Sequence, residues 1–199
     1  MTSYLIIKSE VDELARDILS QSEIRDADSI ARSLAIGTKS MRREARNRLY
    51  DIVKPPPKRP LYYAQQEIAR LPQATRNSVR YLGDYIDLLV KALAFDLIKN
   101  PQCKKCSLGR NVFRNINPDK HKVSWELINS LKRYDSLFYN PGKHDFSEPS
   151  PDREHHFTSI ETIFDVFITF RLAQQIKNAS KFAELVSLDR ESIEDYEDY

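Results

Sequence analysis

Apolar residues recur every three or four positions between residues 74 and 99, and Pro101 follows the segment. Residues with this spacing lie on one face of an α-helix, which has 3.6 residues per turn. The stripe consists of Val79, Leu82, Ile86, Leu89, Leu93 and Leu97. The segment therefore predicts a long amphipathic helix, and the fold has to bury this stripe against other elements.

The same helical spacing recurs along most of the chain, and no segment alternates apolar and polar residues as a half-buried β-strand does. With 4 glycines, the chain is a poor candidate for tightly turned all-β folds, and it carries neither of the two common glycine-rich phosphate-binding motifs. We therefore predict an all-α fold. Further helices are expected over residues 4–20, 28–53, 61–71, 107–116, 125–138 and 158–187.

Residues 54–60, KPPPKRP, contain three consecutive prolines. Proline has no amide hydrogen and favours an extended backbone, so no helix is expected to pass through this segment. It is predicted to be a proline-rich linker between an N-terminal helical hairpin, residues 1–53, and a helical bundle, residues 61–187. Residues 188–199 form an acidic tail that offers little apolar surface to bury, and we expect this tail to be disordered.

The N-terminus, the apolar runs and the cysteines predict the cellular compartment and the cofactors of the protein. The N-terminus lacks the basic residues that precede the apolar stretch of a secretory signal, and the longest apolar runs fall short of a membrane span. The 2 cysteines fit a reducing, cytoplasmic setting. Cys103 and Cys106 have the spacing of zinc ligands, but a structural zinc needs four ligands and only His121 follows nearby. We expect no metal, no other cofactor and no membrane association.

Charge is unevenly distributed along a chain whose net charge is +2. Residues 39–59 contain eight Lys or Arg and two Asp or Glu, whereas residues 189–199 contain one Arg and six Asp or Glu. A basic segment gains affinity for nucleic acids by releasing condensed counterions. The alternative is an ordinary solvated helix face, which is favoured because Tyr50 is the only aromatic residue within the segment. The candidate RNA-binding residues are Arg42, Arg43, Arg46, Lys58 and Arg59.

Three of the 4 histidines fall within residues 139–156. Histidine can give or take a proton near neutral pH, and a nearby cation or amide can hold a phosphate oxygen. Because no cluster of carboxylates accompanies these histidines, a two-metal nuclease is not expected. The segment instead fits metal-independent RNA cleavage, in which a base removes the ribose 2′-hydroxyl proton and an acid protonates the leaving oxygen. The candidate catalytic residues are His144, Asn140, Lys143 and Arg153.

The alternative for this segment is purely structural. Asn140, Pro141 and Gly142 are common turn residues, and we expect them to end the preceding helix and reverse the chain. In that interpretation His144 caps a helix or bonds a carbonyl group, and the segment carries no chemistry.

The helical bundle and the short polar motif before its last helix resemble the HEPN superfamily, over residues 73–187. HEPN proteins are small all-α bundles, often dimers, that are found in RNA processing and in toxin–antitoxin, abortive-infection and CRISPR-associated defence systems. Their nuclease members carry an arginine, commonly followed by a polar residue such as asparagine, and a histidine a few residues later, and they cut RNA without metal. Asn140 matches the polar residue and His144 the histidine, but Tyr139 stands at the arginine position.

This departure leaves several functions open, because tyrosine cannot supply the fixed cation of a guanidinium. The resemblance implies a HEPN-like RNA-binding or defence-associated module that lacks nuclease activity. One alternative is a metal-independent endoribonuclease that uses His144 with another cation, such as Arg153. A second alternative is a helical adaptor between proteins. The expected partners are RNA or a protein such as an antitoxin or a defence-system subunit.

A homodimer is predicted through the C-terminal bundle. The helix expected over residues 158–187 carries apolar residues around much of its circumference, more than one buried stripe needs. They include Phe164, Val166, Phe167, Ile168 and Phe170.

Overall fold

The computed structural model describes residues 9–53, 60–71, 74–143 and 157–180. The described residues form helices and no strand, which confirms the predicted all-α class. Within these ranges, none of the helices combines the length and the apolarity needed to cross a membrane. The elements are α1 (Ser9–Ile18), α2 (Gln21–Ile36), α3 (Lys39–Ile52), α4 (Leu61–Ile68), α5 (Thr75–Ile98), η1 (Pro101–Lys105), α6 (Leu108–Arg110), η2 (Asn111–Asn115), α7 (Pro118–His121), α8 (Trp125–Tyr134), η3 (Asp135–Tyr139), α9 (Asn140–Lys143) and α10 (Ser159–Ala179).

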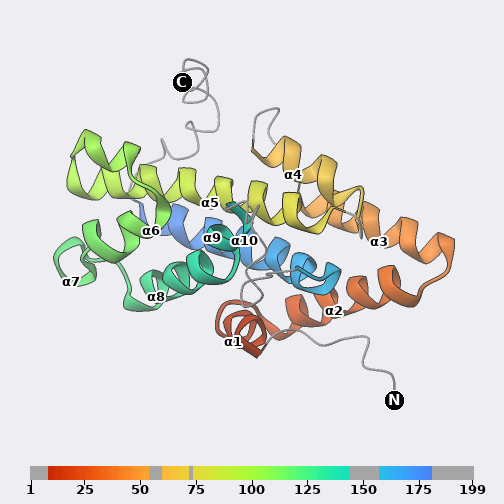
Figure 1. Ribbon diagram of the computed structural model, residues 1–199. Coiled ribbons are helices and arrows are strands. Elements are labelled where there is room, and N and C mark those ends of the chain that lie inside the picture. The colour runs from red at the N-terminus through yellow and green to blue at the C-terminus, as the bar shows by residue number, and fades with distance from the viewer. Residues whose placement is uncertain (1–8, 54–59, 72–73, 144–156, 181–199) are drawn as a thin grey trace, which may run out of the picture.

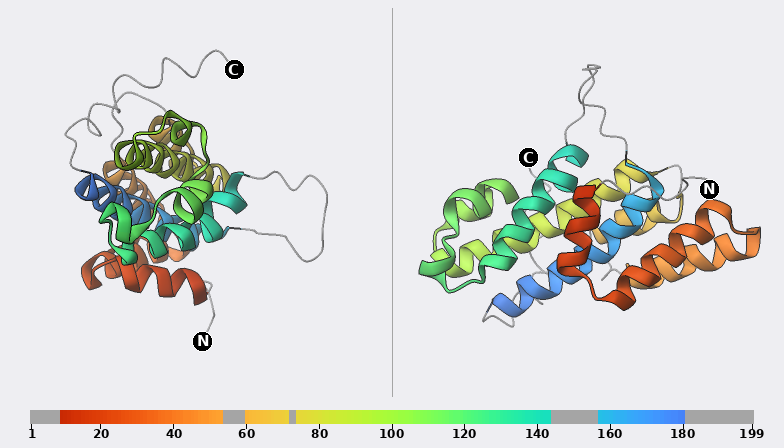
Figure 2. Two further views of the ribbon diagram at one scale, coloured as in Figure 1. Left: turned by 90° about the vertical axis from the view of Figure 1, so that its left-hand side faces the viewer. Right: turned by 90° about the horizontal axis from the view of Figure 1, so that it is seen from below.

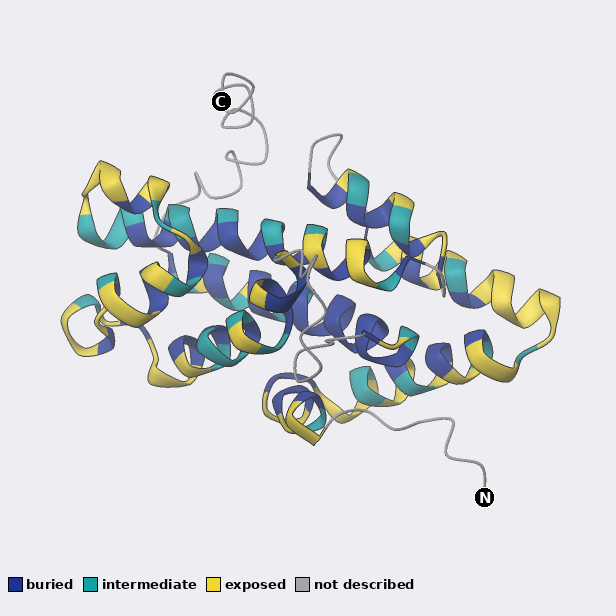
Figure 3. Ribbon diagram, in the orientation of Figure 1, coloured by how far each residue is buried: buried dark blue, intermediate teal, exposed yellow. Residues whose placement is uncertain are grey.

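Two long helices, α5 and α10, pack along each other at the centre of the molecule (Figure 1). α10 also contacts α1, α2 and α8, so neighbours surround it. Most of its apolar residues are therefore buried within one chain, and Phe170 is partly buried. Figure 3 shows this helix mainly in the colour of buried residues. Burial inside the chain accounts for the apolar circumference from which the dimer was predicted. The dimer itself stays a prediction.

α1 crosses α10 and α8 on the lower face of the molecule (Figure 2, right). Its inner face buries four apolar residues, Val11, Leu14, Ala15 and Ile18. Arg133 of α8 forms ion pairs with Asp17 and Glu13 of α1. Apolar burial and these ion pairs hold α1 beside α8.

The N-terminal region differs from the predicted pair of helices. Residues 1–8, at the start of the first predicted helix, lie outside the described part of the chain. α2 begins at Gln21 because Ser20 and Glu23 form a capping box. Gly37, expected inside one long helix, follows the end of α2, and Thr38 begins a new helix by accepting the Met41 amide. α2 and α3 form a hairpin that projects from the bundle (Figure 1).

A helix continues where a turn was predicted. The prediction that Asn140-Pro141-Gly142 ends the helix is wrong, because these residues form most of α9. The Asn140 amide donates to the Asp135 carbonyl, five residues back, which makes η3 a π-helix. Proline lacks the amide hydrogen that an α-helix interior needs, and a π segment is one way for a helix to absorb such a mismatch. The predicted chain reversal falls on residues 144–156, outside the described residues.

Two large apolar side chains of the predicted helices are exposed. Met41 is 47% exposed, since α3 buries only Ala45 and Leu49. Trp125 is 49% exposed, and its ring nitrogen donates to Asp119 Oδ1 at 3.0 Å. Most of the proline-rich linker, residues 54–59, and all of the acidic tail lie outside the described residues.

Candidate functional site

The predicted catalytic residues divide between described and undescribed parts of the chain. Asn140 and Lys143 are exposed on the single turn of α9. His144 and Arg153 lie outside the described residues, so their catalytic roles stay predictions. Tyr139, which the resemblance to HEPN proteins would align with an arginine, is 3% exposed and lies inside the bundle.

Close backbone packing joins η3 and α9 to α5. A Cβ atom added at Gly83 of α5 would lie 2.7 Å from Tyr139 Cδ2, and one added at Gly142 of α9 would lie 3.2 Å from Val79 Cγ1. A third Cβ, added at Gly109 of α6, would lie 2.7 Å from Asp135 Oδ2. A larger side chain at Gly83 would therefore force α5 and η3 apart. Two of the 4 glycines, Gly83 and Gly142, serve the contact with α5, and Gly109 lets α6 approach the Asp135 side chain.

Ionisable side chains meet across this contact, which we call the α5–α9 seam. α5 contributes acids and a lysine at helical spacing, and η3 with α9 contributes an acid, a tyrosine and a lysine at positions four apart. The Tyr139 hydroxyl accepts a hydrogen bond from Lys143 Nζ at 2.9 Å. Asp87 pairs with Lys91 Nζ at 2.7 Å and accepts the Leu108 amide at 2.5 Å. The six residues of the seam are Asp84, Asp87, Lys91, Asp135, Tyr139 and Lys143.

The surroundings shift the acid–base behaviour of the seam. Burial raises the pKa of Asp135 to about 6, and the neighbouring Asp87 acts in the same direction. Burial likewise raises the pKa of Asp84, although the Arg80 guanidinium opposes the shift. Burial and the nearby Asp87 raise the pKa of Tyr139. Tyr139 is therefore neutral at physiological pH and does not replace an arginine as a cation.

A second polar group lies fully inside the bundle. Tyr134 and Thr169 share a hydrogen bond of 2.8 Å, and the Thr169 hydroxyl donates to Asp165 Oδ1 at 3.1 Å. Burial raises the pKa of Asp165 to about 8, so this carboxyl is protonated near neutral pH. Its Oδ2 atom has no hydrogen-bond partner among the residues that the structure describes.

Sequence reasoning missed Asp165 and the acids of the seam. The available signal was acids placed among apolar residues, as in IFDVF around Asp165 and YIDLL around Asp87. Such acids are buried only when they are paired, hydrogen-bonded or protonated.

The cysteine pair does not gather further ligands in the described residues. Cys103 is buried, and the Cys106 thiol donates to the Gln102 carbonyl at 3.2 Å. His121 Nδ1 accepts the Asn117 amide at 3.0 Å. No group of three or more His, Cys, Asp or Glu within the described ranges is arranged to hold a metal ion.

The predicted RNA-binding residues of α3 have different surroundings. Arg42 and Arg43 are exposed, and neither has an ion-pair partner among the described residues. Arg46 instead donates to the Leu71 carbonyl at 3.1 and 3.3 Å, so it links α3 to the end of α4. Lys58 and Arg59 lie outside the described residues.

A row of aromatic rings, which we call the tyrosine ladder, lies on the neighbouring helices α4 and α5. The Arg80 guanidinium lies 5.9 Å from the Tyr81 ring centroid. Tyr81 stacks on Tyr63 at 5.3 Å, and Tyr62 meets Tyr63 edge-on at 5.7 Å. Tyr62 is 47% exposed at the end of this row. We call the ladder, with Arg42 and Arg43, the basic–tyrosine face.

The three helices that carry these residues are linked by contacts through α4. α4 packs on α5 and on α3, and Gln65 Nε2 donates to the Tyr50 carbonyl at 3.2 Å. Exposed residues cover much of the α3 surface (Figure 3). Aromatic rings next to cations provide stacking partners for bases and a charge for phosphates, which is the chemistry of sequence-tolerant single-strand binding.

Comparison of the chain with protein-family models, with curated proteins and with solved structures gives no match. The functional argument therefore depends on the side chains and their arrangement.

Proposed function

We propose that this chain is a HEPN-like module that binds single-stranded RNA through the basic–tyrosine face without cutting it. The observation that carries the proposal is the tyrosine ladder, which ends in the exposed ring of Tyr62. Stacking of a base on an aromatic side chain contributes roughly 1–3 kcal/mol. The guanidinium groups of Arg42 and Arg43, which have no ion-pair partner in the described part of the chain, add the salt-dependent attraction to phosphates. The resemblance to HEPN proteins favours a role in a defence or toxin–antitoxin system.

The seam supports binding without cleavage. The side chain at the family's arginine position is a neutral tyrosine that contacts α5 and lies among Asp84, Asp87 and Asp135. Ionised carboxylates repel the phosphate backbone and oppose the charge that develops during phosphoryl transfer.

Binding is tested by fluorescence anisotropy with a labelled single-stranded RNA at several salt concentrations. We expect Tyr62→Ala to weaken binding by roughly 10-fold or more, because one stacking platform is lost. The double variant Arg42→Ala/Arg43→Ala should reduce the slope of log affinity against log salt by about 1.4, since each phosphate contact on a single strand contributes about 0.7.

A matched control is the double variant Arg110→Ala/Arg114→Ala. Both arginines are exposed in α6 and η2, at the opposite end of the molecule from α3 (Figure 1). This variant has the same charge as the α3 variant and should retain the affinity of the wild type. Absence of RNA binding by the wild type, or an equal loss in the control, would refute the proposal.

A second candidate is the metal-independent endoribonuclease that uses His144. It is favoured by the placement of Asn140 and Lys143, both exposed on the turn of α9 that leads into His144. If the wild type cuts RNA in the presence of EDTA, His144→Ala should slow cleavage by roughly 100- to 10,000-fold. Tyr139→Arg should bring no gain of cleavage, because its guanidinium would meet Asp84 and Asp87 rather than RNA.

A further inference from the structure

The tip of the α2–α3 hairpin exposes apolar side chains beside positive charge. Ile36 is 70% exposed and Met41 is 47% exposed. Lys39, between them, is exposed and has no ion-pair partner among the described residues. Transfer of a large aliphatic side chain out of water is favourable. The protein would therefore be more stable with this tip covered than with it exposed. We call Ile36, Lys39 and Met41 the hairpin tip.

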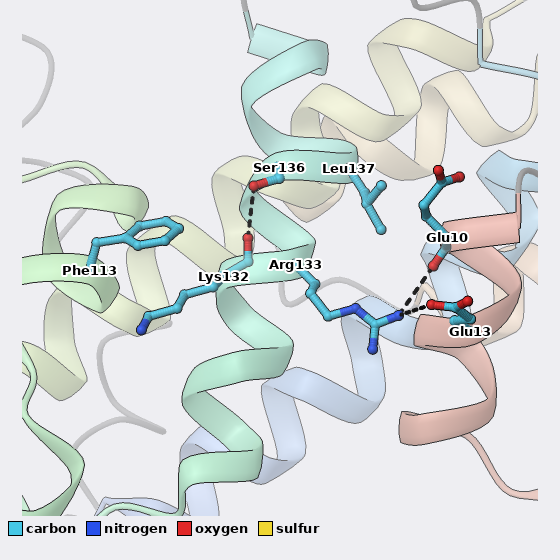
Figure 4. A pocket seen from close by; sticks show the side chains of 7 residues that line it. All are labelled: Glu10, Glu13, Phe113, Lys132, Arg133, Ser136 and Leu137. Carbon is cyan, nitrogen blue, oxygen red and sulfur yellow. Dashed lines mark hydrogen bonds and ion pairs between the residues drawn. The ribbon is translucent and has the colours of Figure 1, made fainter.

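An apolar pocket of ≈ 340 Å³ lies between α1, η2 and the end of α8 with η3. Its volume is within the range of roughly 300–1,000 Å³ that is typical of ligand sites. Phe113 and Leu137 form apolar walls, and Phe113 is 54% exposed (Figure 4). Lys132 Nζ lies 5.3 Å from the Phe113 ring centroid, so the stem of this lysine covers part of the same wall. We call this feature the α1–η3 pocket.

Acidic residues border the pocket on its α1 side. Glu10 and Glu13 extend from α1 opposite Phe113 (Figure 4). Glu13 Oε2 lies 3.5 Å from the Arg133 guanidinium, whereas Glu10 has no ion-pair partner within the described residues. Lys132 and Arg133 line the opposite side of the pocket. An apolar group accompanied by a cation would therefore complement the apolar wall and Glu10 on the α1 side.

The hairpin tip has this combination of groups, but its own pocket is out of reach. α2 has 16 residues and begins near the end of α1, so it carries the tip about 24 Å away at roughly 1.5 Å per residue. Figure 1 shows the tip and the α1–α8 contact at separate places on the molecule.

We propose that Ile36 at the hairpin tip of one copy inserts into the α1–η3 pocket of a second copy, with Lys39 beside Glu10. Because the two surfaces differ, the contact is heterologous, and a pair of copies still has one free tip and one free pocket between them. Repetition of such a contact produces rings or open chains rather than a simple two-fold dimer. This association uses neither α10 nor the tyrosine ladder.

The test uses two variants of the full chain and sedimentation velocity at micromolar concentrations. Ile36→Ser removes the inserted side chain, and Phe113→Ser removes one wall of the pocket. Each should weaken association by roughly 10- to 100-fold, the factor that burial of one large apolar side chain contributes. Both residues are exposed, so unchanged thermal unfolding should show that the variants remain folded.

Mixing the two variants gives the decisive measurement. The intact tip of the Phe113→Ser chain can enter the intact pocket of the Ile36→Ser chain, so the mixture should form a 1:1 complex of twice 23.2 kDa and stop there. The wild type should form larger species as concentration rises. Tyr62→Ala, with a similarly exposed aromatic side chain on another surface, should associate like the wild type.

Three outcomes would overturn the inference. The wild type could sediment as a single 23.2 kDa species at every concentration. Ile36→Ser could associate as strongly as the wild type, which would assign association to another surface. The mixture could also fail to form a complex although each variant is folded. If Tyr62→Ala weakens RNA binding but associates like the wild type, RNA binding and self-association depend on different surfaces. The two proposals can then fail independently.

Discussion

At the scale of single residues, burial decides the charge of the groups in the seam. Tyr139 is neutral, and its hydroxyl accepts from Lys143 Nζ at 2.9 Å. Asp135 occupies a half-buried site, and its pKa is raised to about 6. An ionised carboxylate is less stable there than in water. The seam therefore makes stability depend on pH.

We expect Asp135→Asn to reduce the change of the free energy of unfolding with pH. Because the folded pKa is raised above the ordinary value of 3.8, Asp135 favours folding below pH 3.8, and this contribution is lost as pH rises to about 6. Above that pH the ionised group destabilises the fold. After discounting for partial exposure, Asp135→Asn should raise the free energy of unfolding at neutral pH by about 1 kcal/mol. Urea unfolding at several pH values tests this, and equal pH profiles for variant and wild type would contradict it.

At the scale of elements, a close approach of backbones joins α5 to η3. Gly83 lies in the middle of α5, where glycine costs about 1 kcal/mol relative to alanine. A Cβ atom there would lie 2.7 Å from the Tyr139 ring and 3.3 Å from Tyr139 Cα. The contact between the helices thus requires a residue that weakens one of them.

Gly83→Ala should therefore destabilise the protein in spite of alanine's higher helix propensity. Overpacking costs roughly 1–3 kcal/mol, which exceeds the propensity gain, so we expect a net loss of about 1 kcal/mol in the free energy of unfolding. Chemical denaturation measures the loss. Asn77→Ala, at an exposed position of the same helix, should be neutral or slightly stabilising. A stabilised Gly83→Ala would mean that the seam is looser than described.

At the scale of the whole molecule, α10 is the shared core of the bundle. It contacts α5 along its length and also α1, α2 and α8. Ile168 is 0% exposed and Phe167 is 9% exposed, although both were expected at a dimer interface. The proposed partner surfaces, the basic–tyrosine face and the hairpin tip, therefore lie on other elements.

If α10 is a core helix, Ile168→Ala should lower the stability of the fold and leave the self-association constant unchanged. Truncating a buried isoleucine should cost roughly 2–5 kcal/mol, measured as a shift in urea unfolding. Gln174→Ala, at an exposed position of α10, is the control and should change little. If Ile168→Ala altered the association constant while stability was unchanged, α10 would be an interface helix.

The sequence alone predicted most helices, because helical periodicity is a local property of the chain. The stripe over residues 74–99 corresponds to α5, and the helix predicted over residues 107–116 corresponds to α6 with η2. The sequence also showed a tyrosine, Tyr139, where the resemblance to HEPN proteins would place an arginine. Even locally, the π-helix before Pro141 was missed, because proline and glycine more often mark a turn.

Only the tertiary structure decided which side chains act together. Asp84 and Asp135 belong to one seam although 51 positions separate them in the chain, and Tyr63 stacks on Tyr81 of another helix. Arg46 appeared to be a free cation but bonds the Leu71 carbonyl. Spacing within a helix determines which residues share a face, but not which helix covers that face. The partner across a contact is therefore set by packing of the whole bundle, because burial energy depends on area and not on sequence separation.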